Sequence, residues 1–239
     1  MYYIIDNKIN NIENIKISLE VYMVATSKIK TIDREKYMTE EEVRLLRSVC
    51  RDRAAIDLKK GRQGHIRMWM IIDIVTTSGL RVSEIANLDI GDYFPCSKRP
   101  YLKVKSAKKR KVEYETVPVS KDLVEHLNGY LDWRRDCFNE DISKDKPLLT
   151  SSRGQRYTVS ALQKLFKKAC ENAGLDEKYS IHSARHTLGF LLLKKTKNLR
   201  LVQKQLRHSS PQITAAFYAD VAFEEQQDAL NGLFEEMSD

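Results

Sequence analysis

The sequence predicts an α+β domain that is mostly helical and carries one small antiparallel β-sheet. Apolar residues recur at intervals of three and four along most of the 239 residues, which is typical of amphipathic helices packed on a core. Only residues 101–119 change to an alternation of period two, which indicates a β-hairpin. Hydrophobic residues make up 42% of the chain, and no internal repeat or low-complexity linker interrupts it, so we expect a globular protein.

The first helices are predicted from apolar spacing and capping signals. Residues 1–37 show weak apolar periodicity, which favours one amphipathic helix. Thr39 followed three residues later by Glu42 is a capping box and predicts the start of the next helix. A further helix runs through 68–75 to a turn at Ser78-Gly79, and another begins near Arg81.

The hairpin follows these helices, and its tip is strongly basic. YLKVK and VEYETVPV both alternate, and the polar stretch SAKKRK between them reads as the turn. The remaining helices are predicted at 123–133, from Thr158 to Gly174, at 183–195, at 199–207 and from about Ala222 to the end.

The charge balance favours a polyanionic partner. Lys and Arg number 41 against 33 Asp and Glu, which gives a formal charge of +8, and 98–111 holds the densest basic cluster. Such a surface gains affinity for nucleic acid by releasing counterions. The four cysteines form no C-x-x-C pair, so neither a zinc site nor a disulfide framework is indicated. No secretory signal or membrane-spanning run is found, and we expect a cytoplasmic, nucleoid- or DNA-associated protein.

Several residue types in the chain suit the cleavage of a phosphodiester. Its negative charge grows in the transition state, so fixed cations and hydrogen-bond donors must surround the oxygens. Arginine binds phosphate through a planar fork and keeps its charge. A nucleophile and an acid for the departing oxygen are also needed. The candidates lie in GLRVSE (79–84), the basic hairpin, HSARH (182–186) and LRHSS (206–210), which is followed by Tyr218.

At these positions the chain resembles the tyrosine recombinase family, which includes phage integrases and Xer-type resolvases. The family pattern T-G-L-R-x-S-E is matched by residues 78–84, and H-x-x-R-H is matched by 182–186. The pattern L-G-H-S-S is matched by 206–210, with Tyr218 at the family's spacing for the nucleophile. The resemblance spans about 38–221. It implies a helical catalytic domain with a small antiparallel sheet.

The resemblance also implies a role for each matched residue. Arg81 and Arg185 would bind the non-bridging phosphate oxygens, and His182 would act as a general base or hydrogen-bond donor. His208 would donate a hydrogen bond to the phosphate, and Tyr218 would attack it to give a 3′-phosphotyrosine. No metal and no nucleotide cofactor is implied, because the phosphotyrosine conserves the energy of the bond.

Supporting residues follow from the same comparison. Lys105 is the expected general acid for the 5′ oxygen, with Lys108 as the alternative, because this hairpin is longer than the family's G-K-G-x-K-x-R. Glu84 is expected to hold the cations of the site, and His186 to pack beside it. The hairpin residues expected to contact DNA are Lys103, Lys108, Lys109, Arg110 and Lys111.

The implied partners are double-stranded DNA and three further copies of the chain, which form a tetramer on two duplexes joined by a Holliday junction; an accessory DNA-bending protein is a further candidate. We expect a short N-terminal segment at 1–37, the catalytic domain at 38–221, and a C-terminal helix at 222–239 that docks on a neighbouring protomer. Most family members carry a helical core-binding domain before the catalytic one. The chain is therefore expected to be a minimal recombinase, like the fimbrial inversion enzymes, or a truncated relative.

Two other functions fit the same residues. A type IB topoisomerase-like enzyme would use the same chemistry to nick and close DNA without regard to sequence. A non-catalytic regulator derived from an integrase would bind DNA without needing Tyr218. Each candidate residue also has an ordinary structural explanation on its own: Arg81, for example, could cap a helix or pair with Glu84 at i, i+3. The order and spacing of all the motifs together favour the recombinase.

Overall fold

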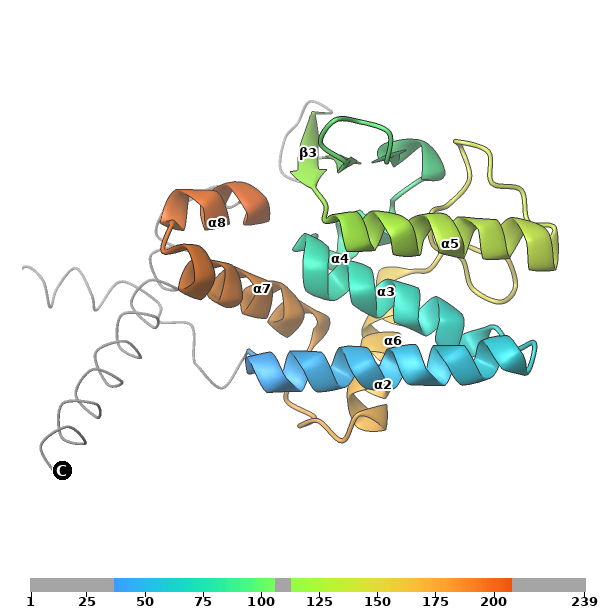
Figure 1. Cartoon of the computed structure of the whole chain (residues 1–239), viewed down its shortest axis with the longest axis horizontal. Coiled ribbons are helices and arrows are strands. Elements are labelled where there is room, and N and C mark those ends of the chain that lie inside the picture. The colour runs from blue at the N-terminus through green and yellow to red at the C-terminus, as the bar shows by residue number, and fades with distance from the viewer. Residues whose placement is uncertain (1–36, 106–112, 208–239) are drawn as a thin grey trace, which may run out of the picture. The chain divides into compact units, whose positions relative to one another are not determined.

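The computed structural model describes residues 37–105 and 113–207, all of which belong to one compact unit (Figure 1). The predicted fold class is confirmed: helices dominate this part of the chain, and its single sheet is small and antiparallel. The elements are α2 (Glu40–Lys59), α3 (Gly64–Ser78), α4 (Val82–Ala86), the 3-10 turn η2 (Ile90–Asp92), β1 (Tyr93–Phe94), β2 (Tyr101–Lys105), β3 (Tyr114–Pro118), α5 (Lys121–Phe138), α6 (Val159–Asn172), α7 (Ile181–Thr196) and α8 (Leu199–Leu206).

Helix α3 is the centre of the core. It packs against α2, α5, α6 and α7, and in Figure 1 it lies between α2 and α5. Met70, Ile71, Ile72 and Ile74 are fully buried, because neighbours cover the helix on several sides. Such a helix is apolar around most of its circumference rather than on one stripe. The core therefore fixes the end of α3, where the turn at Gly79 begins.

Capping residues set where several helices begin. The Thr39 hydroxyl accepts from the Glu42 N–H, and the Glu42 carboxylate accepts from the Thr39 N–H, as the sequence predicts. Helix α7 begins at Ile181 rather than at 183, because Ser180 is its N-cap and accepts from the Ser183 N–H. This earlier start places His182 in the first turn of the helix.

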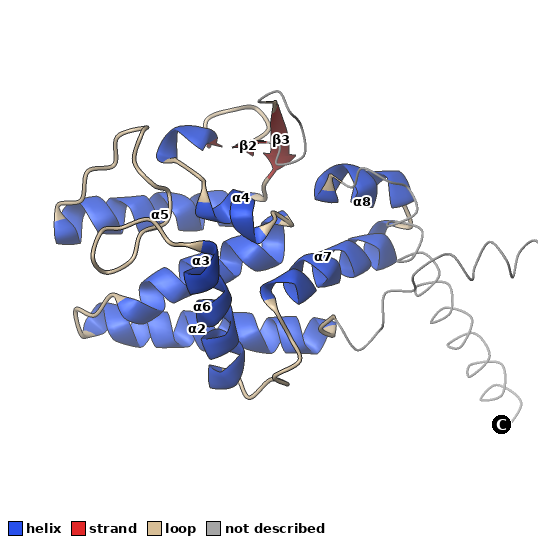
Figure 2. Cartoon of the chain, turned by 180° about the vertical axis from the view of Figure 1, so that it is seen from behind, coloured by secondary structure: helices blue, strands red, loops and turns tan. Residues whose placement is uncertain are grey.

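The sheet consists of β1, β2 and β3 in that order, all antiparallel. Figure 2 labels its strands β2 and β3. The predicted hairpin is present as β2 and β3, with Lys105 opposite Tyr114 and Val104 opposite Glu115. Leu102, Val104 and Val117 are buried on one face, which agrees with the alternation in the sequence. The two-residue strand β1 was not predicted, since it is too short to show any periodicity.

Candidate active site

The turn that carries Arg81 is held in place by a glycine. Gly79 closes α3 with φ at 70°, a left-handed conformation that favours glycine. A Cβ added there would lie 2.7 Å from Leu206 Cδ2, so the glycine also allows the end of α8 to approach. Arg81 follows as the N-cap residue of α4, and its N–H donates to Glu84 at 2.7 Å. The turn and the end of α8 are therefore packed directly together.

Helix α7 supplies the second arginine. Arg185 is buried, and its guanidinium donates to the carbonyl of Gly79 and to that of Leu206. Burial lowers the pKa of Arg185 to about 10, and repulsion from Arg81 and Arg207 adds to the shift. The side chain stays protonated at neutral pH. One buried cation thus joins the turn after α3 to the end of α8.

The two arginines meet at the residues that directly precede His208. Arg81 Nη2 donates to the Arg207 carbonyl at 3.2 Å, while Arg185 reaches the adjacent Leu206 carbonyl. Segments more than 100 residues apart in sequence are therefore brought to one point. His208 and Tyr218 lie outside the described residues.

The two histidines of α7 differ in exposure. His182 is exposed, and it lies one helical turn before the buried Arg185. His186 is half-buried, one residue beyond Arg185. The helix therefore offers an exposed imidazole on the same side as the buried guanidinium, because positions i and i+3 share a face.

Glu84 is the buried anion of the cluster. Its side chain is 2% exposed, and it pairs with Arg81 Nη1 at 2.9 Å and with Arg207 Nη2. Burial alone would raise the pKa of this carboxyl, but the Arg207 charge, the Arg81 N–H and the Arg81 charge hold it below its usual value. One carboxylate therefore stays ionised among three arginines, and the cluster keeps an excess of positive charge.

The hairpin brings its lysines to the edge of the described region. Lys105 is exposed at the end of β2, while Lys103 Nζ lies 4.2 Å from the centre of the Tyr114 ring. Gln205 on α8 donates to the Pro118 carbonyl at 3.4 Å and to the Ser78 carbonyl at 3.0 Å, which attaches β3 to the cluster. The hairpin tip lies outside the described residues, and with it Lys108, Lys109, Arg110 and Lys111.

Arg207 and Glu115 belong to this cluster but were not predicted from the sequence. Arg207 is the residue that replaces the glycine of the L-G-H-S-S pattern, and this replacement was the available signal. Its Nε lies 3.2 Å from Glu115 Oε2 on β3. Glu115 lies in no sequence motif. It becomes a neighbour of Arg207 only when the chain folds, so the sequence alone does not indicate it.

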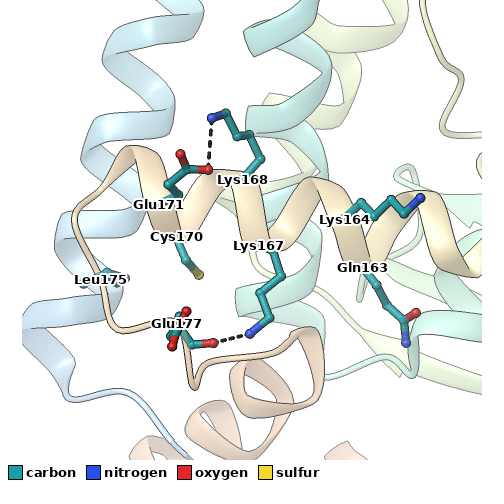
Figure 3. A pocket seen from close by; sticks show the side chains of 8 residues that line it. All are labelled: Gln163, Lys164, Lys167, Lys168, Cys170, Glu171, Leu175 and Glu177. Carbon is teal, nitrogen blue, oxygen red and sulfur yellow. Dashed lines mark hydrogen bonds and ion pairs between the residues drawn. The ribbon is translucent and has the colours of Figure 1, made fainter.

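Away from the arginine cluster, a hollow lies on α6 and on the loop that follows it (Figure 3). It has a volume of about 540 Å³, and three lysines line it: Lys164, Lys167 and Lys168. Lys168 pairs with Glu171 at 2.9 Å, and Lys167 donates to the Glu177 carbonyl. Burial raises the pKa of the Cys170 thiol to about 11, so it is a poor nucleophile. This hollow is a weaker candidate than the arginine cluster.

Within 37–105 and 113–207, no group of three His, Cys, Asp or Glu side chains is arranged to hold a metal ion. None of the helices in these ranges combines the length and apolar character that a membrane span requires.

Comparison with known proteins identifies the class that this fold and cluster define. Residues 14–225 match the sequence profile described as the Phage integrase family, so the chain belongs to this family. Among curated proteins it is similar to the tyrosine recombinase XerH of Campylobacter jejuni, with 29% identity over 182 residues. This match covers 76% of our chain and 47% of XerH, so the chain spans about half the length of that relative.

Solved structures share the fold. The XerA recombinase crystal structure gives a TM-score of 0.64 at 25% identity, over 81% of this chain and 65% of XerA. XerH bound to a palindromic difH substrate, in a post-cleavage complex, gives 0.65 at 21% identity, over 84% of this chain and 56% of that one. Because the identity to XerH in this complex is only 21%, this similarity shows a shared fold and nothing further.

Proposed function

We propose that this chain is the catalytic part of a site-specific DNA recombinase, which cleaves and rejoins DNA strands through Tyr218. The observation that carries the proposal is the convergence of Arg81 and Arg185 on the two backbone carbonyls that precede His208. Cations with fixed positions and an excess of positive charge form a site for an anion whose charge grows during reaction. A scissile phosphodiester is such an anion, and the family's relatives are named tyrosine recombinases.

The proposed chemistry is a transesterification. Arg81 and Arg185 bind the two non-bridging oxygens, and His182 and His208 add hydrogen bonds to the phosphate or to the nucleophile. The Tyr218 oxygen attacks phosphorus, its proton passes to a base, and the bond from phosphorus to the 5′ oxygen breaks. The product is a 3′-phosphotyrosine.

The departing oxygen needs a proton. Lys105 is the proposed donor, with Lys108 as the alternative, and the result is a free 5′ hydroxyl. Rejoining is the reverse reaction: a 5′ hydroxyl attacks the phosphotyrosine, and Tyr218 leaves. The bond energy is retained throughout, so the proposed scheme includes no cofactor.

Double-stranded DNA is the proposed substrate, in the cytoplasm. The charge of +8 and the basic residues of the hairpin, of which Lys105 is exposed, favour contacts with the phosphate backbone, which position the protein. Bending of the DNA and a few groove contacts would then select the sequence. An accessory DNA-bending protein fits this scheme as a further partner.

We propose that 38–221 is the catalytic domain, preceded by a short segment at 1–37. Four copies would assemble on two duplexes, with residues 222–239 of each docking on the next.

Deletion of 222–239 is therefore expected to abolish the tetramer on DNA while a single copy still binds. Sedimentation of the protein–DNA complex measures this, and tetramers that persist in the deletion variant would contradict the docking role.

The experiment that tests the proposed function is covalent trapping. The protein is mixed with a library of randomised, nicked duplexes from which the cleaved fragment diffuses away, and an SDS-resistant protein–DNA adduct is sought. We expect an adduct with the wild-type protein and none with Tyr218→Phe, which lacks the attacking oxygen. Sequencing the trapped strands then identifies the target site.

The same experiment separates the alternatives. DNA binding without any adduct, equal in wild type and Tyr218→Phe, would favour the non-catalytic regulator. Adducts with no sequence preference, together with relaxation of supercoiled plasmids, would favour the topoisomerase-like enzyme.

A further inference from the structure

Arg207 has a backbone conformation that glycine adopts more easily. It is the C-cap residue of α8, with φ at 52° and ψ at 47°, in the left-handed region. Residues with a Cβ are strained there, and the family pattern has glycine at this position. An arginine at a strained position needs an interaction of its side chain that offsets the strain.

The Arg207 side chain makes such interactions with two carboxylates. It is 6% exposed, and its Nη2 donates to Glu84 on α4. Its Nε lies 3.2 Å from Glu115 Oε2 on β3, which makes an ion pair. The Nε–H is not directed at this oxygen, so the pair is not also a hydrogen bond. Nη1 has no hydrogen-bond partner in 37–105 or 113–207. The guanidinium thus spans two elements.

Both carboxylates connect to candidate residues of the site. Glu84 also holds Arg81, through its Nη1 at 2.9 Å and through its N–H at 2.7 Å. Glu115 lies opposite Val104 in the sheet, one position from the pair formed by Lys105 and Tyr114. The carbonyl of Arg207 accepts from Arg81 Nη2 as well. Arg207 therefore links the phosphate-binding arginine to the hairpin strands.

We propose that Arg207 is a positioning residue for strand cleavage. It fixes the Glu84 carboxylate, and through it the Arg81 guanidinium, and it holds β3 against the same point. A lysine cannot do this, because one ammonium lacks the fork that reaches two carboxylates in different directions. The role deepens the proposed function and rests on it.

Arg207→Gly tests the role with little disturbance of the backbone. Glycine suits the left-handed conformation, which offsets only part of the stability lost with the buried Arg207–Glu84 ion pair, so we expect a lower melting temperature and measure cleavage well below it. At saturating DNA the rate of adduct formation should fall about tenfold or more, while the dissociation constant for DNA stays close to the wild-type value. Hydrogen exchange of the Arg81 N–H should accelerate, because its acceptor Glu84 is no longer fixed.

Lys197→Gly is the matched control. Lys197 is a cation at the C-cap of α7 with φ at 54°, and it is exposed, so the same change is made away from the cluster. Its cleavage rate should match the wild type. Arg207→Lys should restore little of the rate. Glu115→Gln should lower the rate in the wild type but add little in the Arg207→Gly background, since its effect acts through Arg207.

The outcomes separate this role from the proposed function. If wild type gives the adduct and Arg207→Gly cleaves at the same rate, only the positioning role fails. Full rescue by Arg207→Lys, or a loss explained entirely by weaker DNA binding, would also overturn it. If wild type gives no adduct on any duplex, the proposed function fails, and the positioning role with it.

Discussion

Arg185→Lys is expected to slow strand cleavage about a hundredfold to a thousandfold, the effect of removing a donor fixed near the developing charge. The guanidinium of Arg185 donates to the Gly79 and Leu206 carbonyls at once, which leaves it fixed and charged beside Arg81. A lysine ammonium cannot reach both carbonyls and a phosphate oxygen from one planar group. The Arg185→Lys variant keeps the positive charge, so a lower cleavage rate would show that the geometry of the guanidinium is required.

A buried arginine elsewhere in the fold provides the control for this variant. Arg134 is 1% exposed and donates to the Pro147 and Leu148 carbonyls at 3.0 and 2.9 Å, and its partners include none of the candidate site residues. Arg134→Lys should lower the free energy of unfolding, as Arg185→Lys does, but leave the cleavage rate of the folded protein unchanged. The rates are measured on the trapped duplexes below both melting temperatures. Equal rates for Arg185→Lys and wild type would exclude Arg185 from the phosphate site.

The helices and the hairpin could be predicted because their signals are local. The Thr39–Glu42 capping box lies within four residues, and the alternation of 101–105 is read directly from the strand itself. The start of α7 was placed two residues late, because Ser180 was not recognised as an N-cap. Strand β1 has two residues and exists only through its pairing with β2, so no local pattern could predict it.

Of the candidate site, only the residues that lie within short sequence motifs could be predicted. Arg81, Arg185 and Glu84 were found because each lies in a short pattern, and the structure brings them together. The contact between Arg207 and Glu84 joins residues 123 positions apart, and Glu115 lies in no motif at all. Such contacts depend on how α8 and β3 pack, which spacing along the chain does not encode.

Glu84→Gln is expected to lower the free energy of unfolding by about 3 kcal/mol or more at pH 7, as for a buried ion pair that loses one partner. The amide can still accept from the Arg81 N–H, so the N-cap of α4 is preserved. What disappears is the negative charge among Arg81, Arg185 and Arg207. Chemical denaturation of both proteins gives the difference.

The difference should depend on pH with a defined sign. The pKa of Glu84 is lower in the folded protein than its unfolded value of about 4.3. A depressed pKa contributes stability that is fully present above the unfolded value and is lost as pH falls through the folded value. Glutamine does not titrate. The difference in the free energy of unfolding between wild type and Glu84→Gln should therefore be constant from pH 7 to about 5 and should become smaller below about pH 4.

Added inorganic phosphate links this measurement to the proposed function. If the arginine cluster is built to bind an oxyanion, phosphate can replace part of the charge that Glu84→Gln removes, and binding to the folded state raises stability by mass action. Phosphate should therefore stabilise Glu84→Gln more than wild type, and chloride at equal ionic strength should not. If phosphate leaves the difference in the free energy of unfolding unchanged, the positive charge of the three arginines is balanced within the fold. That result would argue against a phosphodiester binding at this cluster.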